Sequence, residues 1–304
     1  MKLAIIGLGK MGANIARRLS LAGHEIVAFN RSSQRTMELQ KEIALDPAYS
    51  LEEVIEKLSP PRIVWVMVTA GKMTEDVITQ LSSLLEPGDI LLDGGNSYYK
   101  ETIRRFELIK KKKISFLDIG VSGGIWGLEN GYSLMIGGNE KDVKYLKPIF
   151  QDLAPSKNGG WGRVGSVGSG HFVKMIHNGI EYGMMEAIAE GFDLLKAKEE
   201  FELDLVEVAS IWQEGSVVRS WLLDLTKAAL EKNQSLSNIE SYVEDSGEGR
   251  WTVEESIELS IPTPVITESL FRRFSSRQTD NFTLKLLAAI RNQFGGHEIK
   301  SKRK

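Results

Sequence analysis

The sequence predicts an α/β, Rossmann-type, doubly wound parallel sheet at the N-terminus, followed by an all-α helical domain. Short apolar runs alternate with helical patterns through the first half of the chain, which is typical of a parallel sheet covered by helices on both faces. A glycine- and serine-rich stretch at residues 159–170 interrupts this alternation. Almost everything after it has helical spacing. We therefore expect one domain at residues 1–166 and a second, helical domain at residues 167–304.

The elements of the first domain follow from its apolar runs. The expected strands are residues 2–7, 25–30, 62–68, 89–93, 115–120 and 132–137. The helical patterns between them cover residues 11–22, 33–43, 51–57, 73–85 and 100–112. In the second domain one long pattern, residues 172–198, is about 40 Å long if it is fully helical. Shorter helices are expected at residues 203–213, 220–232, 253–259, 263–275 and 281–293.

Composition excludes several classes of function. The 304 residues carry a formal net charge of −3, so the chain is not a polyelectrolyte that seeks nucleic acid. It has no cysteine, which rules out disulfides, zinc-thiolate sites and thiol nucleophiles and fits a reducing compartment. We find no apolar run of membrane-spanning length, and the apolar N-terminus resembles a buried strand more than a signal peptide. We expect a cytoplasmic protein without nucleic-acid or membrane partners.

A dinucleotide-binding loop opens the chain. It is Gly7-Leu8-Gly9-Lys10-Met11-Gly12, which follows a strand and enters a helix, as this fingerprint requires. Gly7 allows the turn, Gly9 lets the backbone approach a pyrophosphate, and Gly12 lets the helix pack on the strand. The free N–H groups of the helix N-terminus then attract the phosphates. We also assign Val68, at the end of the third expected strand, to the cofactor site.

The end of the second strand indicates which cofactor binds. An acidic residue there would bind the adenosine ribose and repel a 2′-phosphate. This chain has Asn30, Arg31 and Ser32 instead, and Arg31 can make charge-assisted bonds to a phosphate. We expect NADP to be preferred over NAD. The alternative is that Arg31 is only a solvated loop residue.

The long helix presents a polar face near its start. At about 100° per residue, Lys174, Asn178 and Glu181 fall within about 60° of one another. His177 and Tyr182 flank them. A separate apolar arc is expected to be buried in the helical domain; it consists of Val173, Ile176, Ile180, Met184 and Ala187. Lys174 and Glu181 are seven residues apart, too far for an ordinary helical ion pair, so a functional site is the better interpretation.

Two loops and the tail add candidate binding groups. Asn96 lies in the loop of residues 92–97, and Ser122, Gly123 and Gly124 lie in the loop of residues 120–124. Both follow strands, and ligands of open parallel sheets bind outside the carboxyl ends of the strands. Near the C-terminus, Arg291 and His297 surround a glycine turn and could bind a phosphate, although a frayed end is equally compatible with that pattern.

Taken together, these segments resemble 6-phosphogluconate dehydrogenase of the short class, in the β-hydroxyacid dehydrogenase superfamily. The resemblance covers nearly the whole chain and is carried by GLGKMG, LDGGNS, GVSGG, GHFVKMIHNGIEY and RNQFGGH. It implies oxidative decarboxylation of 6-phosphogluconate to ribulose 5-phosphate and carbon dioxide in the pentose phosphate pathway and gluconate utilization, with NADP or NAD and no metal.

The resemblance also implies roles. Lys174 would be the base that takes the C3 hydroxyl proton, and Glu181 the acid that protonates C1 of the enediol after carbon dioxide leaves. The helical domain would bind substrate and form a homodimer or higher homo-oligomer, in which the tail completes the neighbouring site. The substrate contacts would be Asn96, Ser122, Gly123, Gly124, His177, Asn178, Tyr182, Arg273, Arg291 and His297. The cofactor contacts would include Asn96 as well as the glycine loop, residues 30–32 and Val68.

One departure leaves alternatives open. Long members of the family carry a phosphate-binding lysine where this chain has Ser246, and Arg250 is the candidate that would compensate. Unphosphorylated gluconate is therefore an alternative substrate. Two further alternatives are a β-hydroxyacid dehydrogenase acting on a smaller acid and a catalytically silent, nucleotide-sensing protein.

Overall fold

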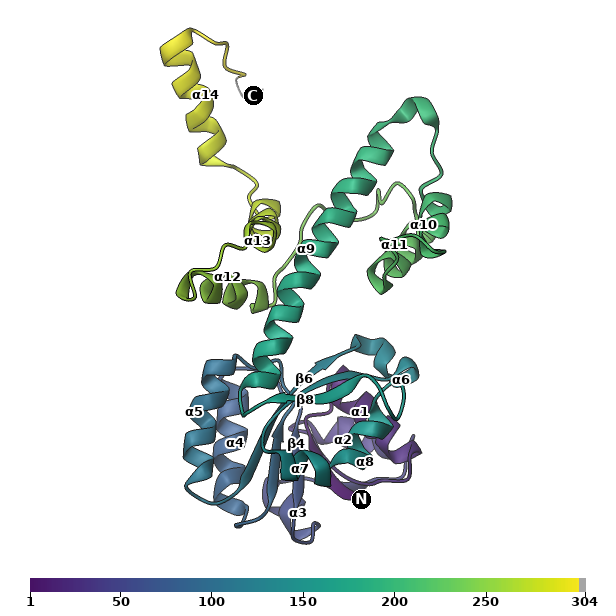
Figure 1. The fold of residues 1–304 in the computed structure, drawn as a ribbon, viewed down its shortest axis with the longest axis vertical. Helices are drawn as coiled ribbons and strands as arrows, with labels where there is room; N and C mark the ends of the chain where they lie inside the picture. The colour runs from purple at the N-terminus through teal and green to yellow at the C-terminus, as the bar shows by residue number, and fades with distance from the viewer. Residues whose placement is uncertain (301–304) are drawn as a thin grey trace. The chain divides into compact units, whose positions relative to one another are not determined.

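The computed structural model describes residues 1–300 and divides the chain into two compact units, Met1–His177 and Asn178–Lys304 (Figure 1). The first contains an α/β sheet with helices on both faces, and the second is helical. Both features of the predicted fold class are confirmed.

The sheet of the first unit has eight strands in the order β3-β2-β1-β4-β5-β6-β7-β8. Their bounds are β1 Lys2–Ile6, β2 Glu25–Phe29, β3 Asp46–Ala48, β4 Ile63–Val66, β5 Ile90–Asp93, β6 Ser115–Ser122, β7 Ser133–Gly137 and β8 Trp161–Gly165. The first six strands in this order run parallel, whereas β7 is antiparallel to β6. The sheet is parallel as predicted through these six strands, and β7 is an antiparallel addition beside β6.

Six of these strands were predicted from the sequence, whereas β3 and β8 were not. Strand β3 has only three residues and includes Pro47, so it shows no alternation of apolar and polar positions. Strand β8 lies inside the glycine-rich stretch that we interpreted as a junction. Glycines contribute no side chain to a hydrophobic pattern, so pairing with β7 revealed this strand only in three dimensions.

Helices cover both faces of the sheet because every central strand is apolar on both sides. In β1, Leu3 and Ile5 join one buried cluster while Ala4 and Ile6 join the other. Figure 1 shows α1 and α8 on one face and α4 and α5 on the other. The helices of this unit are α1 Lys10–Leu21, α2 Ser33–Gln40, α3 Leu51–Glu56, α4 Lys72–Leu84, α5 Tyr99–Lys110, η1 Gly124–Trp126, α6 Gly127–Asn130, α7 Glu140–Tyr145 and α8 Lys147–Leu153.

Helix α9, Ser169–Ala197, begins in the first unit and continues into the second. Its distal part packs with α10 and α11 around Phe192 and Leu223. The remaining elements are η2 Glu199–Phe201, α10 Leu205–Gln213, α11 Trp221–Lys232, α12 Glu248–Glu258, α13 Pro264–Ser276 and α14 Phe282–Gly295. Within residues 1–300 we find no helix with the length and apolar character that a membrane span needs.

The expected burial of the apolar arc of α9 is wrong in this chain. Ile180 and Met184 are 51% and 43% exposed, whereas Tyr182 is only 6% exposed. The reason is the packing of α12, which meets α9 at glycine contacts. A Cβ on Gly179 would lie 2.7 Å from Thr252, and one on Gly249 would lie 2.6 Å from the Tyr182 ring. Tyr182 therefore packs inside the second unit, Ile180 and Met184 are exposed, and Val173 and Ile176 are half-buried.

Candidate active site

The glycine loop has the geometry that a bound pyrophosphate requires. Gly7 has a φ of +97°, and a Cβ on Gly12 would lie 2.0 Å from the Gly7 carbonyl oxygen, so neither position accepts a side chain. At Gly9 the corresponding space is open. Helix α1 begins at Lys10 with no side-chain cap and no acidic residue in its first turn. Its free N–H groups therefore offer an anion site, and the residues fit a dinucleotide.

Asn30 holds this loop in place. Its Oδ1 accepts a hydrogen bond from the Leu8 N–H at 2.9 Å, and its Nδ2 donates to the Ser32 carbonyl at 3.1 Å. Arg31 and Ser32 are exposed beside it, as is Lys10, while Met11 is half-buried. The predicted cofactor residues of the loop and of β2 thus lie together at the carboxyl edge of the sheet. Val68 joins them, because a Cβ on Gly7 would lie 2.8 Å from its side chain.

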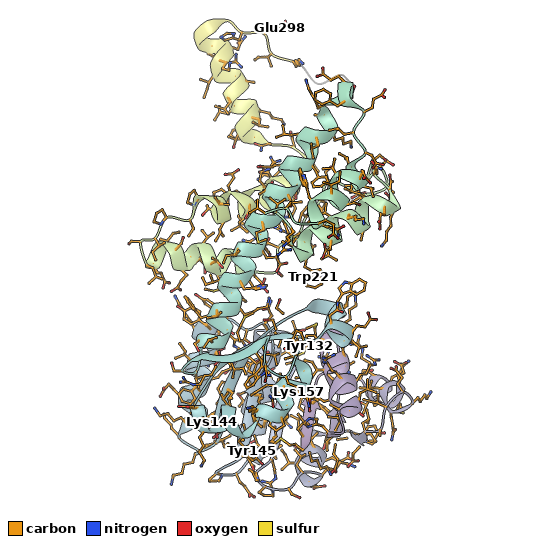
Figure 2. All side chains as sticks on the ribbon, turned by 45° about the vertical axis from the view of Figure 1, so that its right-hand side comes forward. Tyr132, Lys144, Tyr145, Lys157, Trp221 and Glu298 are labelled. Atoms are coloured by element: carbon orange, nitrogen blue, oxygen red, sulfur yellow. The ribbon has the colours of Figure 1, made fainter. Side chains whose placement is uncertain are left out.

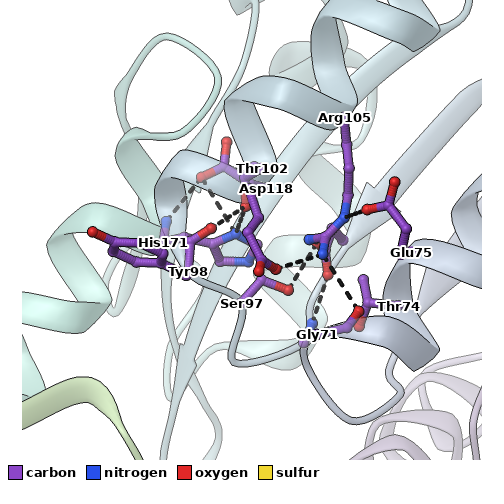
Figure 3. A network of polar contacts seen from close by, with 12 residues as sticks. Gly71, Thr74, Glu75, Ser97, Tyr98, Thr102, Arg105, Asp118 and His171 are labelled. Atoms are coloured by element: carbon purple, nitrogen blue, oxygen red, sulfur yellow. Dashed lines mark hydrogen bonds and ion pairs between the residues drawn. The ribbon is translucent and has the colours of Figure 1, made fainter. Parts of the chain in front are cut away.

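The loop after β5 is organised by Asp93, a fully buried carboxylate. It accepts bonds from the Gly95 N–H at 3.1 Å and from Ser97 Oγ at 3.0 Å. Burial raises the pKa of Asp93, while nearby His171 and Arg105 act in the opposite direction. Arg105 lies 3.7 Å from it and also binds Glu75 (Figure 3). These bonds present Asn96, which is exposed, at the same edge of the sheet.

The loop after β6 turns through two glycines. Gly123 and Gly124 have φ values of +134° and +53°, a region that favours glycine. Tyr132, labelled in Figure 2, supports this loop from inside the first unit, since a Cβ on Gly127 would overlap its ring. Burial raises the pKa of Tyr132 to about 12, so it is a neutral packing residue.

Lys174, His177 and Ser122 form a hydrogen-bonded chain. His177 Nδ1 lies 3.5 Å from Lys174 Nζ, and its Nε2 lies 3.2 Å from Ser122 Oγ. Lys174 is half-buried and stands directly over β6, where a Cβ on Gly120 would be 2.5 Å from its own Cβ. The structure thus brings together three residues that the sequence placed in two separate motifs.

In the second unit, Tyr182 and Arg273 are stacked. The Arg273 guanidinium lies 3.8 Å from the centre of the Tyr182 ring, and its Nη1 donates to the Glu244 carbonyl at 3.1 Å. Among the described residues, its buried Nε has no hydrogen-bond partner. The Tyr182 hydroxyl accepts a bond from the Ser246 N–H at 3.1 Å. Within the described part of the chain, the Arg273 Nε–H is therefore a buried donor that no hydrogen bond uses.

The other predicted substrate residues of this unit lie on α9 and near the C-terminus. On α9, Asn178 is buried and Glu181 half-buried, one and two turns after Lys174. Arg291 and His297 are exposed, on α14 and just after it. Arg250 is engaged elsewhere, since its Nε donates to Asp245 at 2.6 Å and its Nη2 at 3.2 Å.

This ion pair bears on phosphate binding. The hydrogen bond from Arg250, assisted by Arg277, lowers the pKa of Asp245 despite the carboxyl's partial burial. A cation already paired with a carboxylate is a poor substitute for the missing lysine at Ser246.

Two buried carboxylates that organise the site, Asp93 and Asp118, were not predicted from the sequence. The available signal was a single acidic residue inside each apolar strand.

A glycine loop at the carboxyl edge of a doubly wound sheet, together with a lysine and a histidine over β6 of that sheet, defines the class of NAD(P)-dependent dehydrogenases. Residues 2–165 match the family described as the NAD binding domain of 6-phosphogluconate dehydrogenase, and residues 170–303 match its C-terminal domain. The chain therefore belongs to the 6-phosphogluconate dehydrogenase family, whose members are NAD(P)-dependent and decarboxylating.

Individual relatives agree. The chain is 44% identical over 302 residues to YqeC of Bacillus subtilis, covering 99% of this chain and 100% of the relative. It is 40% identical to the NAD(+)-dependent, decarboxylating 6-phosphogluconate dehydrogenase of Haloferax volcanii, with 99% of each covered. The Plasmodium falciparum 6-phosphogluconate dehydrogenase structure matches with a TM-score of 0.84 and 31% identity, over 100% of this chain and 67% of that one.

Proposed function

We propose that this chain oxidises 6-phosphogluconate at C3 and decarboxylates it to ribulose 5-phosphate and carbon dioxide, in the pentose phosphate pathway or in gluconate utilization. The observation that supports this most directly is the hydrogen-bonded chain of Lys174, His177 and Ser122 at the end of β6, in the sheet that carries the cofactor loop. In this proposal the dinucleotide-binding domain ends at residue 166 and the helical substrate-binding domain begins at residue 167. We expect the enzyme in the cytoplasm, where these metabolites occur.

The first step is oxidation. Lys174, as the free amine, takes the proton of the C3 hydroxyl while the C3 hydride leaves. The nicotinamide, when bound, supplies the hydride acceptor. His177 and Ser122 hold the amine and the substrate hydroxyls in line, with Gly123, Gly124, Asn96 and Asn178 as further contacts. The product of this step is a β-keto acid.

The second step is decarboxylation. The bond between the carboxyl carbon and C2 breaks, its electron pair enters an enediol, and carbon dioxide leaves. The ketone oxygen is protonated by Lys174 as charge develops on it. Glu181 then protonates the carbon that lost carbon dioxide, which is C1 of the product. A base followed by an acid is sufficient for this sequence.

In this proposal Tyr182 and Arg273 bind the phosphate of the substrate. The Arg273 Nε–H, which has no partner among the described residues, would donate a charge-assisted hydrogen bond to a phosphate oxygen. This favours 6-phosphogluconate over free gluconate even though Ser246 replaces the expected lysine.

A homo-oligomer is part of the proposal. Helix α14 exposes Phe282 at 73% and Leu284 at 65%, which favours burial against a second copy of the chain. Arg291 and His297 would then reach the neighbouring substrate. Sedimentation of the full chain and of a chain ending at residue 280 tests this: we expect a dimer or larger assembly only for the full chain.

For the cofactor we propose a preference for NADP, with exposed Arg31 and Ser32 as the groups that bind its 2′-phosphate. The amide of Asn30 is already used to hold Leu8, so selectivity rests on these two neighbours.

The activity test uses 6-phosphogluconate, gluconate and 3-hydroxyisobutyrate, each with both cofactors. We expect equal amounts of reduced cofactor and carbon dioxide from 6-phosphogluconate. Cofactor reduction without carbon dioxide would instead indicate a non-decarboxylating relative. Cofactor binding with no reduction by any of the three would indicate a nucleotide-sensing protein.

A further inference from the structure

One face of β6 meets the start of α9 at three successive points. Asp118, Gly120 and Ser122 alternate along the strand, so their side-chain positions point to the same face of the sheet. Ser122 bonds His177, and Gly120 lies under Lys174. Asp118 meets the first turn of the helix. All of these residues lie in the first unit.

Asp118 caps α9 from a distant strand. Its Oδ1 accepts the Gly168 N–H at 2.7 Å, and its Oδ2 accepts the His171 N–H at 2.8 Å. The carboxylate is fully buried. The first N–H groups of a helix have no partner within it, and α9 carries no acidic residue in its own first turn. The buried Asp118 carboxylate therefore provides the hydrogen-bond acceptor and the negative charge that the first turn of α9 lacks.

The backbones of β6 and α9 are in direct contact around this carboxylate. A Cβ on Gly170 would lie 2.4 Å from the Asp118 carbonyl oxygen, and one on Gly137 would lie 2.2 Å from Asp118 Oδ1. With glycine at these positions the helix seats against the strand, and the two bonds from Asp118 define how far along the strand it sits.

A second contact ties this cap to α5. His171 is 2% exposed, and its Nδ1 lies 2.8 Å from Thr102 Oγ1 (Figure 3). Asp118 is also the register partner of Asp93 on β5, which holds the loop of Asn96. Two adjacent buried carboxylates thus organise two chain segments: Asp93 holds the loop of the proposed binding residue Asn96, and Asp118 holds the start of the helix that carries Lys174.

We propose that Asp118 is a positioning residue for catalysis: by capping α9 it sets the place of Lys174 and His177 over β6. This inference rests on the proposed function. Asp118 itself would not contact the substrate. It acts through the helix, so its loss slows hydride transfer without weakening cofactor binding.

The test is Asp118→Asn, because the amide retains the volume but can accept only one of the two bonds. We expect kcat to fall about 10- to 100-fold, as for a misplacement of an ångström or less. The KM for the cofactor should stay near the wild-type value, and the isotope effect with 3-deuterated substrate should rise. The matched control is Asp89→Asn. Asp89 is equally buried in the same unit and accepts the Arg62 and Glu86 N–H groups at the opposite edge of the sheet.

The control should lose stability but keep kcat and the isotope effect. If Asp118→Asn behaves like the control, or if its kcat and cofactor KM change together, the inference is wrong. Hydrogen exchange of the amides in residues 171–177 tests the cap without any turnover. Faster exchange there in Asp118→Asn supports it, and unchanged exchange overturns it.

Inactivity of the wild-type chain on 6-phosphogluconate would defeat the proposed function alone, since the exchange measurement remains decisive for the cap. If Asp118→Asn does not fold, Gly120→Ala carries the test. Its Cβ would lie 2.5 Å from that of Lys174 and lift the helix, so kcat should fall with the cofactor KM retained. A wild-type kcat in that variant would refute the inference.

Discussion

Replacing Arg105 should strongly lower the stability of the first unit. Its side chain is 2% exposed and binds Glu75 and Glu101, each at 2.7 Å, while Asp93 lies 3.7 Å away. Arg105→Met preserves most of the volume and removes the charge. Asp93 would then lose the guanidinium that lies 3.7 Å away, and the two glutamates would lose charge-assisted bonds.

The magnitude follows from burial. Removing one partner of a buried ion pair costs about 3–5 kcal/mol. Since Glu75 and Glu101 are 28% and 41% exposed, water replaces part of what they lose, and we expect the lower end, about 3 kcal/mol. The matched control is Arg104→Met. Arg104 also binds Glu75 but is 55% exposed, so its loss should cost less than about 1 kcal/mol.

The cost should also depend on pH. The pKa of Asp93 is raised by burial, so its protonated form is favoured in the folded state, and ionisation destabilises the fold as pH rises. Without Arg105 this penalty at neutral pH grows. The pKa of Glu75 is lowered by Arg104 and Arg105, so the wild type also loses stability once pH falls below the ordinary glutamate pKa of 4.5. Both effects make the difference in the free energy of unfolding between Arg105→Met and the wild type smaller in acid.

Urea denaturation at pH 7 and pH 5, followed by circular dichroism, measures this gap. We expect it to be about 3 kcal/mol at pH 7 and smaller at pH 5. A gap equal to that of Arg104→Met, or one that does not shrink at pH 5, would refute the reasoning.

The remaining predictions concern the proposed active site. Lys174→Met should lower kcat by about 10²- to 10⁴-fold with cofactor affinity unchanged, in stopped-flow and binding assays; near-normal turnover would remove its role as base. Glu181→Gln should slow carbon dioxide release and product protonation by about 10²-fold while cofactor still binds, and unchanged turnover would count against it. Arg31→Met should lower kcat/KM about tenfold with NADP and little with NAD; an equal loss with both would show that Arg31 does not bind the 2′-phosphate.

Much of the fold was predictable because its signals are local. Strands β1, β2, β4 and β5 are continuous apolar runs. The glycine loop is recognisable because it lies between a strand and a helix. The same holds for the helical face of Lys174. Strand β8 was not predictable, because its glycines carry no pattern and it exists only by pairing with β7.

By itself the sequence determined most of the strands and helices along the chain, the place of the cofactor loop and the residue types offered for chemistry, because each depends on neighbours within a few positions. Only the tertiary structure decided that Ser122 meets His177, that Asp118 caps a helix fifty residues away in the chain, and that Arg250 is committed to Asp245. Those contacts join segments remote in sequence. Their energies come from burial and from close backbone approach, which arise only once the sheet has formed.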